Sequence, residues 1–566
     1  MGRTRRAGGL VTRARRRIAN AVRPNVEVVP VAAGIRAEWD VPVVARDGTT
    51  LRVNVFRPPT DELVPVIMSA HPYGKDAIPA RTRSGHGVNP QYRIFPQPHR
   101  VRFSSWTSWE APDPAVWAPR GFAVVNADLR GGGTSEGTGE LFSDQEAEDY
   151  YDLIEWAGIQ PWSTGRVALD GVSYLAISQY KVAALRPPHL AAICAWEGFS
   201  DLYRDFARPG GVREDGFSII WSALTRRAAR IATNVRTQIV TRPERDAWYA
   251  SVTPDLERID VPMLVCGSFS DHCLHSRGSF EAFRRAGSPR KWLYTHRDGK
   301  WCHYYSQEAT ETRARFFEYV LKGLDTGWPH EPAVRLAIHE AGPEPVEVTH
   351  EDQWPPADLE WTALALDLER GLLVSGEAPS RRGSASFSTR RGRLSLTWVV
   401  PEDLDIIGPM SLRLHVAVRH ADDVHLFAGV RKIREGVECN FEGSFGFAHD
   451  MVSTGWQRAA HRELDAALST REQPVHTHAR AEPLKPGEIV PVEIALLPHA
   501  TRFRRGDRLR LDIRGSWHYP RDPVRGQLPS GYQGSPKGTC VVFSGGPCDS
   551  HLYLGIRPLR PRPAPE

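Results

Sequence analysis

The chain has 566 residues, of which 41% are hydrophobic and 25% charged, and its formal net charge is +5. This composition is that of a globular protein, so it excludes a chain that is disordered throughout, and the small charge excess gives no indication of nucleic-acid binding. The sequence contains neither an apolar run of about 18 residues, which a membrane-spanning helix needs, nor the apolar stretch of a secretory signal. We therefore predict a cytoplasmic protein that binds no membrane. Its seven cysteines lack framework spacing and are expected to be reduced.

A basic arm occupies the first 25 residues. Its arginines have no acidic residue beside them within the arm, and such charge runs are most often solvated and frayed. We predict a flexible tail over residues 1–25, with contact to anionic lipid or RNA as the less favoured alternative. The arginines are Arg3, Arg5, Arg6, Arg13, Arg15, Arg16, Arg17 and Arg23.

Short apolar runs alternate with longer helical stretches over residues 26–339. Val64–Ser69, Phe122–Asn126 and Met263–Cys266 are examples. Runs without polar alternation indicate strands covered on both faces, and hence a mainly parallel sheet with helices on each side. This is the pattern of an α/β domain. Residues 197–259 carry apolar positions at helical spacing instead, which predicts a helical insertion, or cap, over the edge of the sheet.

The pattern changes in the C-terminal part of the chain. Residues 340–356 are rich in Pro and Glu and form the predicted linker. Beyond them, Leu412, Leu414 and Val416 alternate with other residues in the way of a half-buried strand. Strands of this kind, separated by Gly, Pro and Asp turns and by no long helix, predict a C-terminal β-sandwich over residues 357–566.

The strongest local signal for chemistry is the segment from Arg166 to Ser178, which reads as a strand, a Gly-Val-Ser turn and a helix. A serine at such a turn projects its hydroxyl above the sheet, and the helix behind it offers free N–H groups to a developing oxyanion. We therefore predict that Ser173 is a nucleophile. The usual Gly-x-Ser-x-Gly pattern has Leu175 in its last position here, so on the motif alone a serine that caps the helix has equal weight.

A nucleophilic serine needs an acid and a base, which in this fold follow it at the ends of later strands. Asp271 comes just after the apolar strand that begins at Met263, and the next strand ends at His296. We predict a Ser173, His296, Asp271 triad, with His303 as the alternative base in the Trp- and Tyr-rich loop that follows. A lone histidine is more often a packing residue, but the chain order favours the triad.

A loop after the early strand contains Tyr73 within His-Pro-Tyr-Gly-Lys. We expect the Tyr73 hydroxyl and the backbone N–H of Tyr174 to form the oxyanion hole, although Tyr73 by itself would be read as packing. Four aromatic side chains in or beside the helical insertion either belong to the core or form the walls of an apolar acyl pocket. They are Trp196, Phe199, Phe217 and Trp221.

Two further patterns suggest cofactors. The glycine-rich loop Gly131–Gly137 imitates a dinucleotide-binding turn, but a following helix and a ribose-binding acid are unclear. The segment Asp271–His275, with Cys302 and His303, suggests zinc, yet its spacing fits no standard tetrahedral site. We predict neither a cofactor nor a metal.

Taken together, these segments resemble the cocaine esterase and X-Pro dipeptidyl-peptidase family of serine hydrolases (CocE/NonD type), which includes α-amino-acid ester hydrolases. The resemblance extends over nearly the whole chain beyond the basic arm. The matching segments are Arg46–Pro58, His71–Lys75, Asn126–Gly137, Trp162–Gly165, Gly171–Leu175, Asp201–Arg204 with Pro209–Gly211, Gly267–Asp271, Asp405–Pro409 and Ala500–Leu511.

The resemblance implies an α/β-hydrolase domain with a helical cap and a C-terminal jelly roll of the galactose-binding-like type. It also implies a triad of Ser173, Asp271 and a histidine, with Tyr73 and the Tyr174 N–H at the oxyanion. The chain departs from the family pattern at two places. Ala176 stands where glycine is usual, and Gly299–His303 contains Lys300 where the family motif Gly-Pro-Trp-x-His has proline.

We therefore predict a serine hydrolase that cleaves esters, or amides, through an acyl-enzyme, with a small-molecule ester or short peptide as substrate. The alternatives are an X-Pro dipeptidyl-peptidase and a non-catalytic binding module. A dipeptidyl substrate needs buried carboxylates for its ammonium group, and the candidates are Glu197, Glu214 and Asp215. Related enzymes are often oligomeric, so the resemblance also allows a homo-oligomer.

Overall fold

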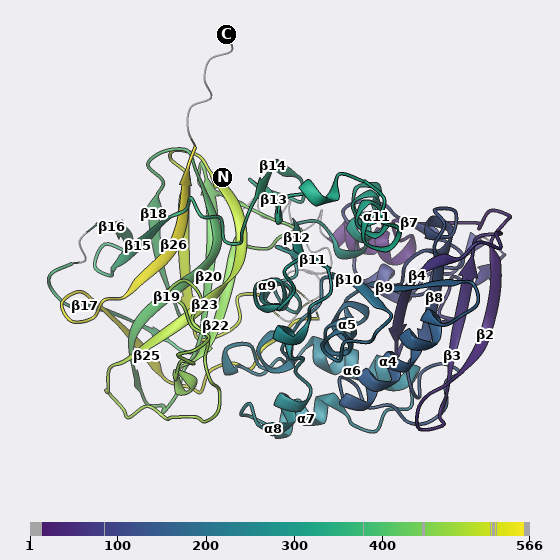
Figure 1. Ribbon diagram of the computed structural model, residues 1–566. Coiled ribbons are helices and arrows are strands. Elements are labelled where there is room, and N and C mark those ends of the chain that lie inside the picture. The colour runs from purple at the N-terminus through teal and green to yellow at the C-terminus, as the bar shows by residue number, and fades with distance from the viewer. Residues whose placement is uncertain are drawn as a thin grey trace, which may run out of the picture.

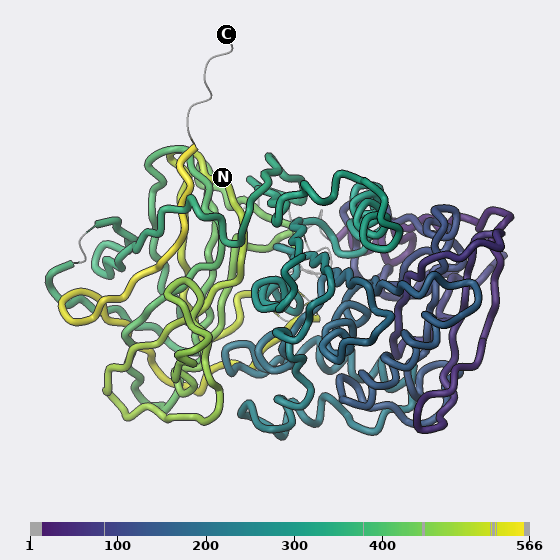
Figure 2. Tube along the Cα trace, viewed as in Figure 1, coloured from purple at the N-terminus to yellow at the C-terminus, as the bar shows by residue number. Residues whose placement is uncertain are grey.

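The computed structural model describes residues 14–83, 85–376, 379–443, 448–520, 522, 527 and 529–559. It contains two domains that lie side by side, the first coloured purple to teal and the second green to yellow in Figures 1 and 2. No helix in these ranges is long and apolar enough to cross a membrane. All seven cysteines are free thiols.

The N-terminal domain is built on one mainly parallel sheet. Its strands are hydrogen-bonded in the order β2-β3-β8-β4-β9-β10-β11-β12-β13-β14, in which β2, β3 and β14 are antiparallel to their neighbours. The continuous apolar runs of β4 and β8 are buried at every position, as expected for strands covered on both faces. The strands are β2 (Arg36–Val44), β3 (Thr50–Arg57), β4 (Val64–His71), β8 (Ala123–Asp128), β9 (Ser163–Val172), β10 (Leu190–Trp196), β11 (Met263–Ser268), β12 (Lys291–His296), β13 (Val334–His339) and β14 (Pro345–Glu351).

Helices cover both faces of this sheet (Figure 1). α4 (Asp144–Gly158), α5 (Tyr174–Ala184) and α9 (Ser276–Arg285) bury their apolar sides in one core cluster. α3 (Pro114–Trp117) and α11 (Gln307–Lys322) belong to a second cluster on the opposite face. The smaller elements are β1 (Val26–Val29), β5 (Arg81–Thr82), β6 (Gly85–His86), α2 (Pro90–Ile94), β7 (Val101–Ser104) and α10 (Lys300–Tyr304).

A helical insertion separates β10 from β11, where the sequence predicts one. Its helices are short, and Asn234 and Asp246 cap two of them with side-chain oxygens that accept backbone N–H groups. The insertion consists of η1 (Leu202–Ala207), η2 (Pro209–Gly211), α6 (Phe217–Ala228), α7 (Val235–Thr241), α8 (Ala247–Ser251) and η3 (Leu256–Arg258).

The C-terminal domain is all β and has its own hydrophobic core. Its long strand β19 pairs with β23, β25 and β26, and β24 pairs with β18 and β20. Its strands are β15 (Glu360–Asp367), β16 (Leu372–Ser375), β17 (Gly383–Ser388), β18 (Arg393–Val399), β19 (Leu404–Arg419), β20 (His425–Arg434), β21 (Val437–Cys439), β22 (Ser453–Arg458), β23 (Val490–Phe503), β24 (Arg508–Arg514), β25 (Thr539–Ser544) and β26 (His551–Pro558).

The two domains are joined by buried contacts. Arg297, which follows β12, donates to the carbonyl oxygens of Met451 and Val452 and stacks over the ring of Phe441. A small apolar cluster also combines Val212 and Cys273 of the first domain with aromatic residues of the second. The segment between the domains is structured as well, because β14 lies within the predicted linker 340–356 and pairs along β13.

The basic arm differs in part from its prediction as a flexible tail. Residues 14–22 are helical, and Asn20 is buried, with its amide donating to the carbonyl oxygens of Tyr92 and Arg93. Arg93 in turn donates to the carbonyls of Ala21 and Val22. These contacts dock the helix on the first domain, a stabilisation that charge composition does not reveal. Residues 1–13 lie outside the described residues.

Candidate active site

Ser173 lies at the tight turn between β9 and α5, as its motif predicts. Its φ of 60° and ψ of −116° are unusual for a residue with a side chain. The turn requires Gly171, since a Cβ added there would lie 2.5 Å from Cβ of Leu175. Ala176 departs from the family pattern, and the glycine at position 198 leaves room for its methyl group. A Cβ added to Gly198 would lie 2.9 Å from the Ala176 methyl. The backbone therefore holds the Ser173 hydroxyl above the carboxyl end of the sheet.

His275 is the histidine that the structure places at Ser173. Its Nε2 lies 3.2 Å from Ser173 Oγ, and its Nδ1 lies 2.5 Å from Asp271 Oδ2. Asp271 and His275 are four residues apart in the turn that leads from β11 into α9, and both are buried. Serine, imidazole and carboxylate thus form one continuous hydrogen-bonded chain, the arrangement of a nucleophile, a base and an orienting acid.

The two histidines weighed from the sequence are elsewhere. His296 Nε2 hydrogen-bonds Glu197 Oε1 at 3.1 Å, and His303 Nε2 hydrogen-bonds the Tyr294 hydroxyl at 3.1 Å. Their rings stack on each other with centroids 4.0 Å apart. Side chains alternate along a strand, so His296 lies on the same face of β12 as Tyr294, beside the Trp196 ring. Within the described residues, neither histidine hydrogen-bonds Ser173.

The segment that holds His275 entered the sequence analysis only as a zinc-like pattern. The i, i+4 spacing of Asp271 and His275 could have found the pair, because residues at that spacing meet on one side of a helical turn. Carboxylate and imidazole atoms of Glu197, Asp271 and His275 do lie within 4.8 Å of one another. However, the Lys300 ammonium lies 3.0 Å from Asp271 Oδ2, so a metal ion there would meet a positive charge.

Lys300 supplies the buried positive charge of the site. Its Nζ lies 3.1 Å from His275 Nδ1 as well as beside Asp271. Burial alone would raise the pKa of Asp271, but Lys300 and His275 hold it well below its usual range. Burial, followed by the charge of Lys300, lowers the pKa of His275. The imidazole is therefore neutral and able to accept a proton at neutral pH.

Glu197 and Glu110 are two further carboxyl groups near Lys300 and Asp271. Burial raises the pKa of Glu197 and that of Glu110 to about 7 each, partly offset by Lys300. Glu110 Oε1 accepts a hydrogen bond from Trp301 Nε1 at 2.8 Å. Glu110 was not singled out from the sequence, because no local motif marks a loop residue that only the fold brings to Ser173.

Tyr73 and Tyr174, the residues predicted to form the oxyanion hole, lie in the same pocket as Ser173. The Tyr73 hydroxyl accepts a hydrogen bond from Trp221 Nε1 at 2.9 Å, which leaves its own proton for another acceptor. Tyr174 is the first residue of α5, where backbone N–H groups have no carbonyl partner within the helix. Its hydroxyl donates to Glu146 Oε2 at 2.5 Å and so fixes the ring.

A pocket with an empty volume of about 450 Å³ opens above Ser173. Phe199, Phe217 and Trp221 line it, together with Glu110 and Lys300. Trp196 does not line this pocket: it is fully buried on the far side of β10, among Tyr294, His296, His303 and Tyr304. The remaining lining residues are Tyr73, Gln91, Trp109, Phe142, Ser173, Tyr174, Ile177, Phe206, Leu274, His275 and Trp301.

The carboxylates considered for a substrate ammonium have other partners. Glu214 accepts the backbone N–H groups of Gly216, Phe217 and Ser218 at the start of α6. Asp215 pairs with arginines of the insertion. Glu197 is buried beside His296. The carboxyl group that lines the pocket is Glu110.

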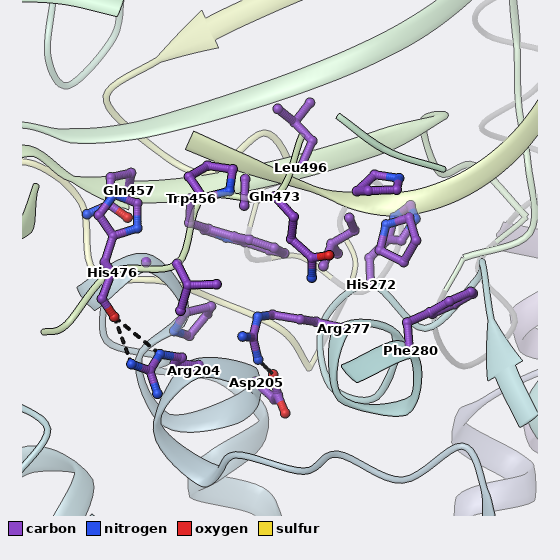
Figure 3. A pocket seen from close by; sticks show the side chains of 18 of the residues that line it. Arg204, Asp205, His272, Arg277, Phe280, Trp456, Gln457, Gln473, His476 and Leu496 are labelled. Atoms are coloured by element: carbon purple, nitrogen blue, oxygen red, sulfur yellow. Dashed lines mark hydrogen bonds and ion pairs between the residues drawn. The ribbon is translucent and has the colours of Figure 1, made fainter. Parts of the chain in front are cut away.

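A larger cavity, with an empty volume of about 830 Å³, lies between the two domains (Figure 3). It shares Leu274 with the pocket above Ser173. Its charged groups already have partners: Arg277 pairs with Asp205, and Arg204 donates to the carbonyl oxygen of His476 (Figure 3). Its described lining residues include no nucleophile with an adjacent base, so the chemistry is assigned to the smaller pocket.

Comparison with known proteins gives two family matches. Residues 47–237 match the X-Pro dipeptidyl-peptidase (S15 family) model, and residues 326–552 match the X-Pro dipeptidyl-peptidase C-terminal non-catalytic domain. The chain thus consists of an α/β-hydrolase-like core followed by a non-catalytic C-terminal domain. The division agrees with the separate hydrophobic core of the C-terminal domain.

Individual relatives point the same way. The chain is 26% identical to a cocaine esterase of Rhodococcus sp. over 408 residues, which is 62% of this chain and 64% of that protein. It is 26% identical to a putative Xaa-Pro dipeptidyl-peptidase of Bacillus anthracis over 51% of this chain and 52% of that protein. The aligned part thus spans less than two thirds of either relative. A solved structure, a CocE/NonD family hydrolase from Staphylococcus aureus, is 34% identical, with a TM-score of 0.87, and the match covers 94% of this chain and 99% of that one.

Proposed function

Because the chain belongs to the CocE/NonD family of hydrolases, we propose that it cleaves carboxylic esters through an acyl-enzyme formed on Ser173. The observation that carries this proposal is the chain of contacts from Ser173 Oγ through His275 to Asp271. A non-catalytic binding module would have no need of a serine held at a strained turn against a buried imidazole and carboxylate.

In this mechanism His275 Nε2 takes the proton from Ser173 as Oγ attacks the ester carbonyl. Asp271 holds the imidazole through Nδ1 and stabilises the imidazolium that forms. The Tyr73 hydroxyl and the Tyr174 N–H donate to the oxyanion of the tetrahedral intermediate. His275 then returns the proton to the leaving alkoxide, and water hydrolyses the acyl-enzyme with His275 again as base.

Lys300 acts on this cycle as a positioning residue. Its ammonium shares Asp271 Oδ2 with His275, so it fixes the carboxylate while it disfavours a second positive charge on the imidazole. The base is therefore neutral at a lower pH than an ordinary histidine. The expected consequence is ester hydrolysis that continues into mildly acidic solution.

The walls of the pocket favour an uncharged acyl group. Phe142, Phe199, Phe206, Phe217 and Trp221 surround the space above Ser173, and burial of apolar substrate area against them gains about 25 cal/mol per Å². We therefore propose esters with small apolar acyl groups as the preferred substrates.

One observation favours a second activity. The Glu110 carboxyl lines the pocket, where an ionised carboxylate would hold the free ammonium of an X-Pro dipeptide. Lys300 opposes this, since it faces the same carboxyl and would repel a substrate cation. The X-Pro dipeptidyl-peptidase activity is accordingly the second candidate.

The deciding experiment compares p-nitrophenyl esters with Gly-Pro and Ala-Pro p-nitroanilides on the full chain. We expect a higher kcat/KM for the esters, and labelling by a fluorophosphonate that the Ser173→Ala variant loses. Faster cleavage of the anilides, with a selective loss of that activity in Glu110→Gln, would establish the peptidase instead. A wild-type chain that reacts with neither substrate nor label would contradict both.

Finer features of the architecture are proposals of the same kind. We propose that residues 197–259 act as a cap over the pocket, since Phe199, Phe206, Phe217 and Trp221 reach it from there, and that the all-β domain is a jelly roll. The buried free thiols support a reducing, cytoplasmic location. Limited proteolysis, followed by identification of the stable fragments, tests the proposed division at residues 340–356.

A further inference from the structure

An open pocket with an empty volume of about 920 Å³ lies at the junction of the helical insertion and the all-β domain, and it shares no lining residue with the pocket above Ser173. Arg208 and Arg213 reach it from the insertion. Arg390 and Arg458 reach it from the all-β domain, beside His425. Four guanidinium groups in the wall of one pocket form a site that carries out no step of the proposed hydrolysis.

Arg208 is the unusual member of this group. It is 3% exposed, yet no carboxylate lies within ion-pair distance of it in the part of the chain that the structure describes. Its Nη2 donates to the carbonyl oxygen of Ile239 at 2.9 Å, and its buried Nε has no hydrogen-bond partner. Arg204, Arg313 and Arg502 are buried arginines that pair with carboxylates, whereas Arg297 donates to two carbonyl oxygens and stacks over Phe441. A buried guanidinium without a counter-ion is destabilising.

The charges around Arg208 add to this imbalance. Burial, together with the positive charges of Arg213 and Arg458, lowers the pKa of Arg208. Its other neighbours, Tyr203 and Tyr249, are neutral phenols whose pKa values burial raises. Positive charge therefore accumulates on the insertion side of the pocket, where Asp215 pairs with Arg213 but no described carboxylate pairs with Arg208.

The acidic groups nearby are already in use. Asp423 accepts from Arg458 Nε at 2.5 Å and from two backbone N–H groups. Asp215 is shared between Arg213 and Arg236. Arg208, Arg213, Arg236 and Arg458 thus face two carboxylates, an excess of two positive charges, while the exposed Arg390 and Asp422 offset each other.

We propose that this junction pocket binds a phosphate group, as inorganic phosphate or as a phosphate monoester. The guanidinium fork matches phosphate oxygens in geometry, and a dianion balances the excess charge. An occupant would contact Arg208 and Arg213 of the insertion and Arg390 and Arg458 of the all-β domain at once. It would therefore hold the two domains together, and binding would raise the stability of the folded chain.

The test is thermal unfolding of the full chain in a phosphate-free buffer, with ionic strength held constant by sodium chloride. We expect inorganic phosphate to raise Tm in a saturable manner that chloride does not reproduce, and calorimetric titration to give the same affinity. Glycerol 3-phosphate in a parallel titration separates the sources, since tighter binding than that of inorganic phosphate indicates a monoester.

Two variants sharpen the test. Arg208→Met removes the buried charge and should abolish the phosphate-dependent shift, while its Tm without phosphate equals or exceeds that of the wild type. Arg390→Gln, at an exposed position, should weaken phosphate binding several-fold without loss of folding. Arg100→Met is the matched control, because Arg100 is exposed and pairs with Glu27 outside the pocket.

Ester hydrolysis is measured in the same samples, and we expect it to be unchanged in Arg390→Gln. The phosphate site is thus tested independently of the proposed activity. A wild type whose Tm responds to phosphate no more than to chloride would overturn the proposal. Retention of the full saturable shift in both Arg208→Met and Arg390→Gln would overturn it as well.

Discussion

His275 and the pair formed by His296 and His303 lie near the carboxyl end of the same sheet, but their contacts differ. His275 has the Ser173 hydroxyl on one nitrogen, a carboxylate on the other and an open pocket above it. His296 and His303 stack on each other against Trp196 and bond to Glu197 and Tyr294. All three histidines are buried, and burial lowers the pKa of each. Burial and a shifted pKa therefore do not identify a base; contact with a nucleophile does.

The strongest test of this contrast removes the nucleophile. Ser173→Ala should lower kcat for p-nitrophenyl ester hydrolysis on the order of a millionfold, because the covalent intermediate cannot form. Circular dichroism and Tm should show that the variant is folded. Hydrolysis within about tenfold of the wild-type rate, which is roughly 1.4 kcal/mol of barrier, would remove Ser173 from the mechanism.

The second test replaces each histidine in turn. His275→Ala should lower kcat on the order of 10⁴-fold or more, since the proton of Ser173 then has no acceptor. His296→Ala and His303→Ala should alter stability and leave kcat within about tenfold of the wild type. If His296→Ala abolishes hydrolysis in a folded chain while His275→Ala is active, the strand-end histidine predicted from the sequence is the base.

A third test replaces Lys300, whose ammonium lies 3.1 Å from His275 Nδ1. Because its charge lowers the pKa of His275, Lys300→Met should raise that pKa, move the acid limb of the kcat/KM profile to higher pH and lower kcat/KM in acidic solution. Lys300→Arg, which keeps the charge, should restore part of the acidic range. An unchanged limb in a folded Lys300→Met variant would show that Lys300 only packs.

The smallest expected effect concerns the aromatic residues of the pocket above Ser173, compared with Trp196 beside His296 and His303. Each CH₂ added to the acyl group of an ester should gain roughly 0.8 kcal/mol, or about fourfold in kcat/KM, until the pocket is full. Phe217→Ala should flatten this dependence, because Phe217 lines the pocket. Trp196→Phe is the control in the other region and should leave the dependence unchanged. The reverse pattern would place the acyl group on the Trp196 side of the sheet.

Much of the architecture follows from local patterns. The apolar runs of β4, β8 and β11 occur where the sequence predicts strands, and the Gly-Val-Ser turn joins β9 to α5. Such elements depend on residues within a few positions of one another. The structure of the linker was harder to predict, because its Pro and Glu content does not indicate that β14 pairs with β13.

What the sequence determined by itself is therefore the hydrolase family, the two-domain order and the places of Ser173, Asp271, Tyr73 and Tyr174 at strand ends and loop turns. Only the tertiary structure decided which side chains meet there. Chain order led to the strand-end His296, with His303 as its alternative, but His296 lies on the face of β12 that packs beside Trp196. His275, which follows Asp271 by four residues, was not weighed as a base. Glu110, in a loop, and Lys300, the first residue of α10, reach the pocket above Ser173 from segments that are distant in sequence. For the same reason Arg208 could be recognised as a buried charge without a carboxylate only once the insertion was packed against the all-β domain.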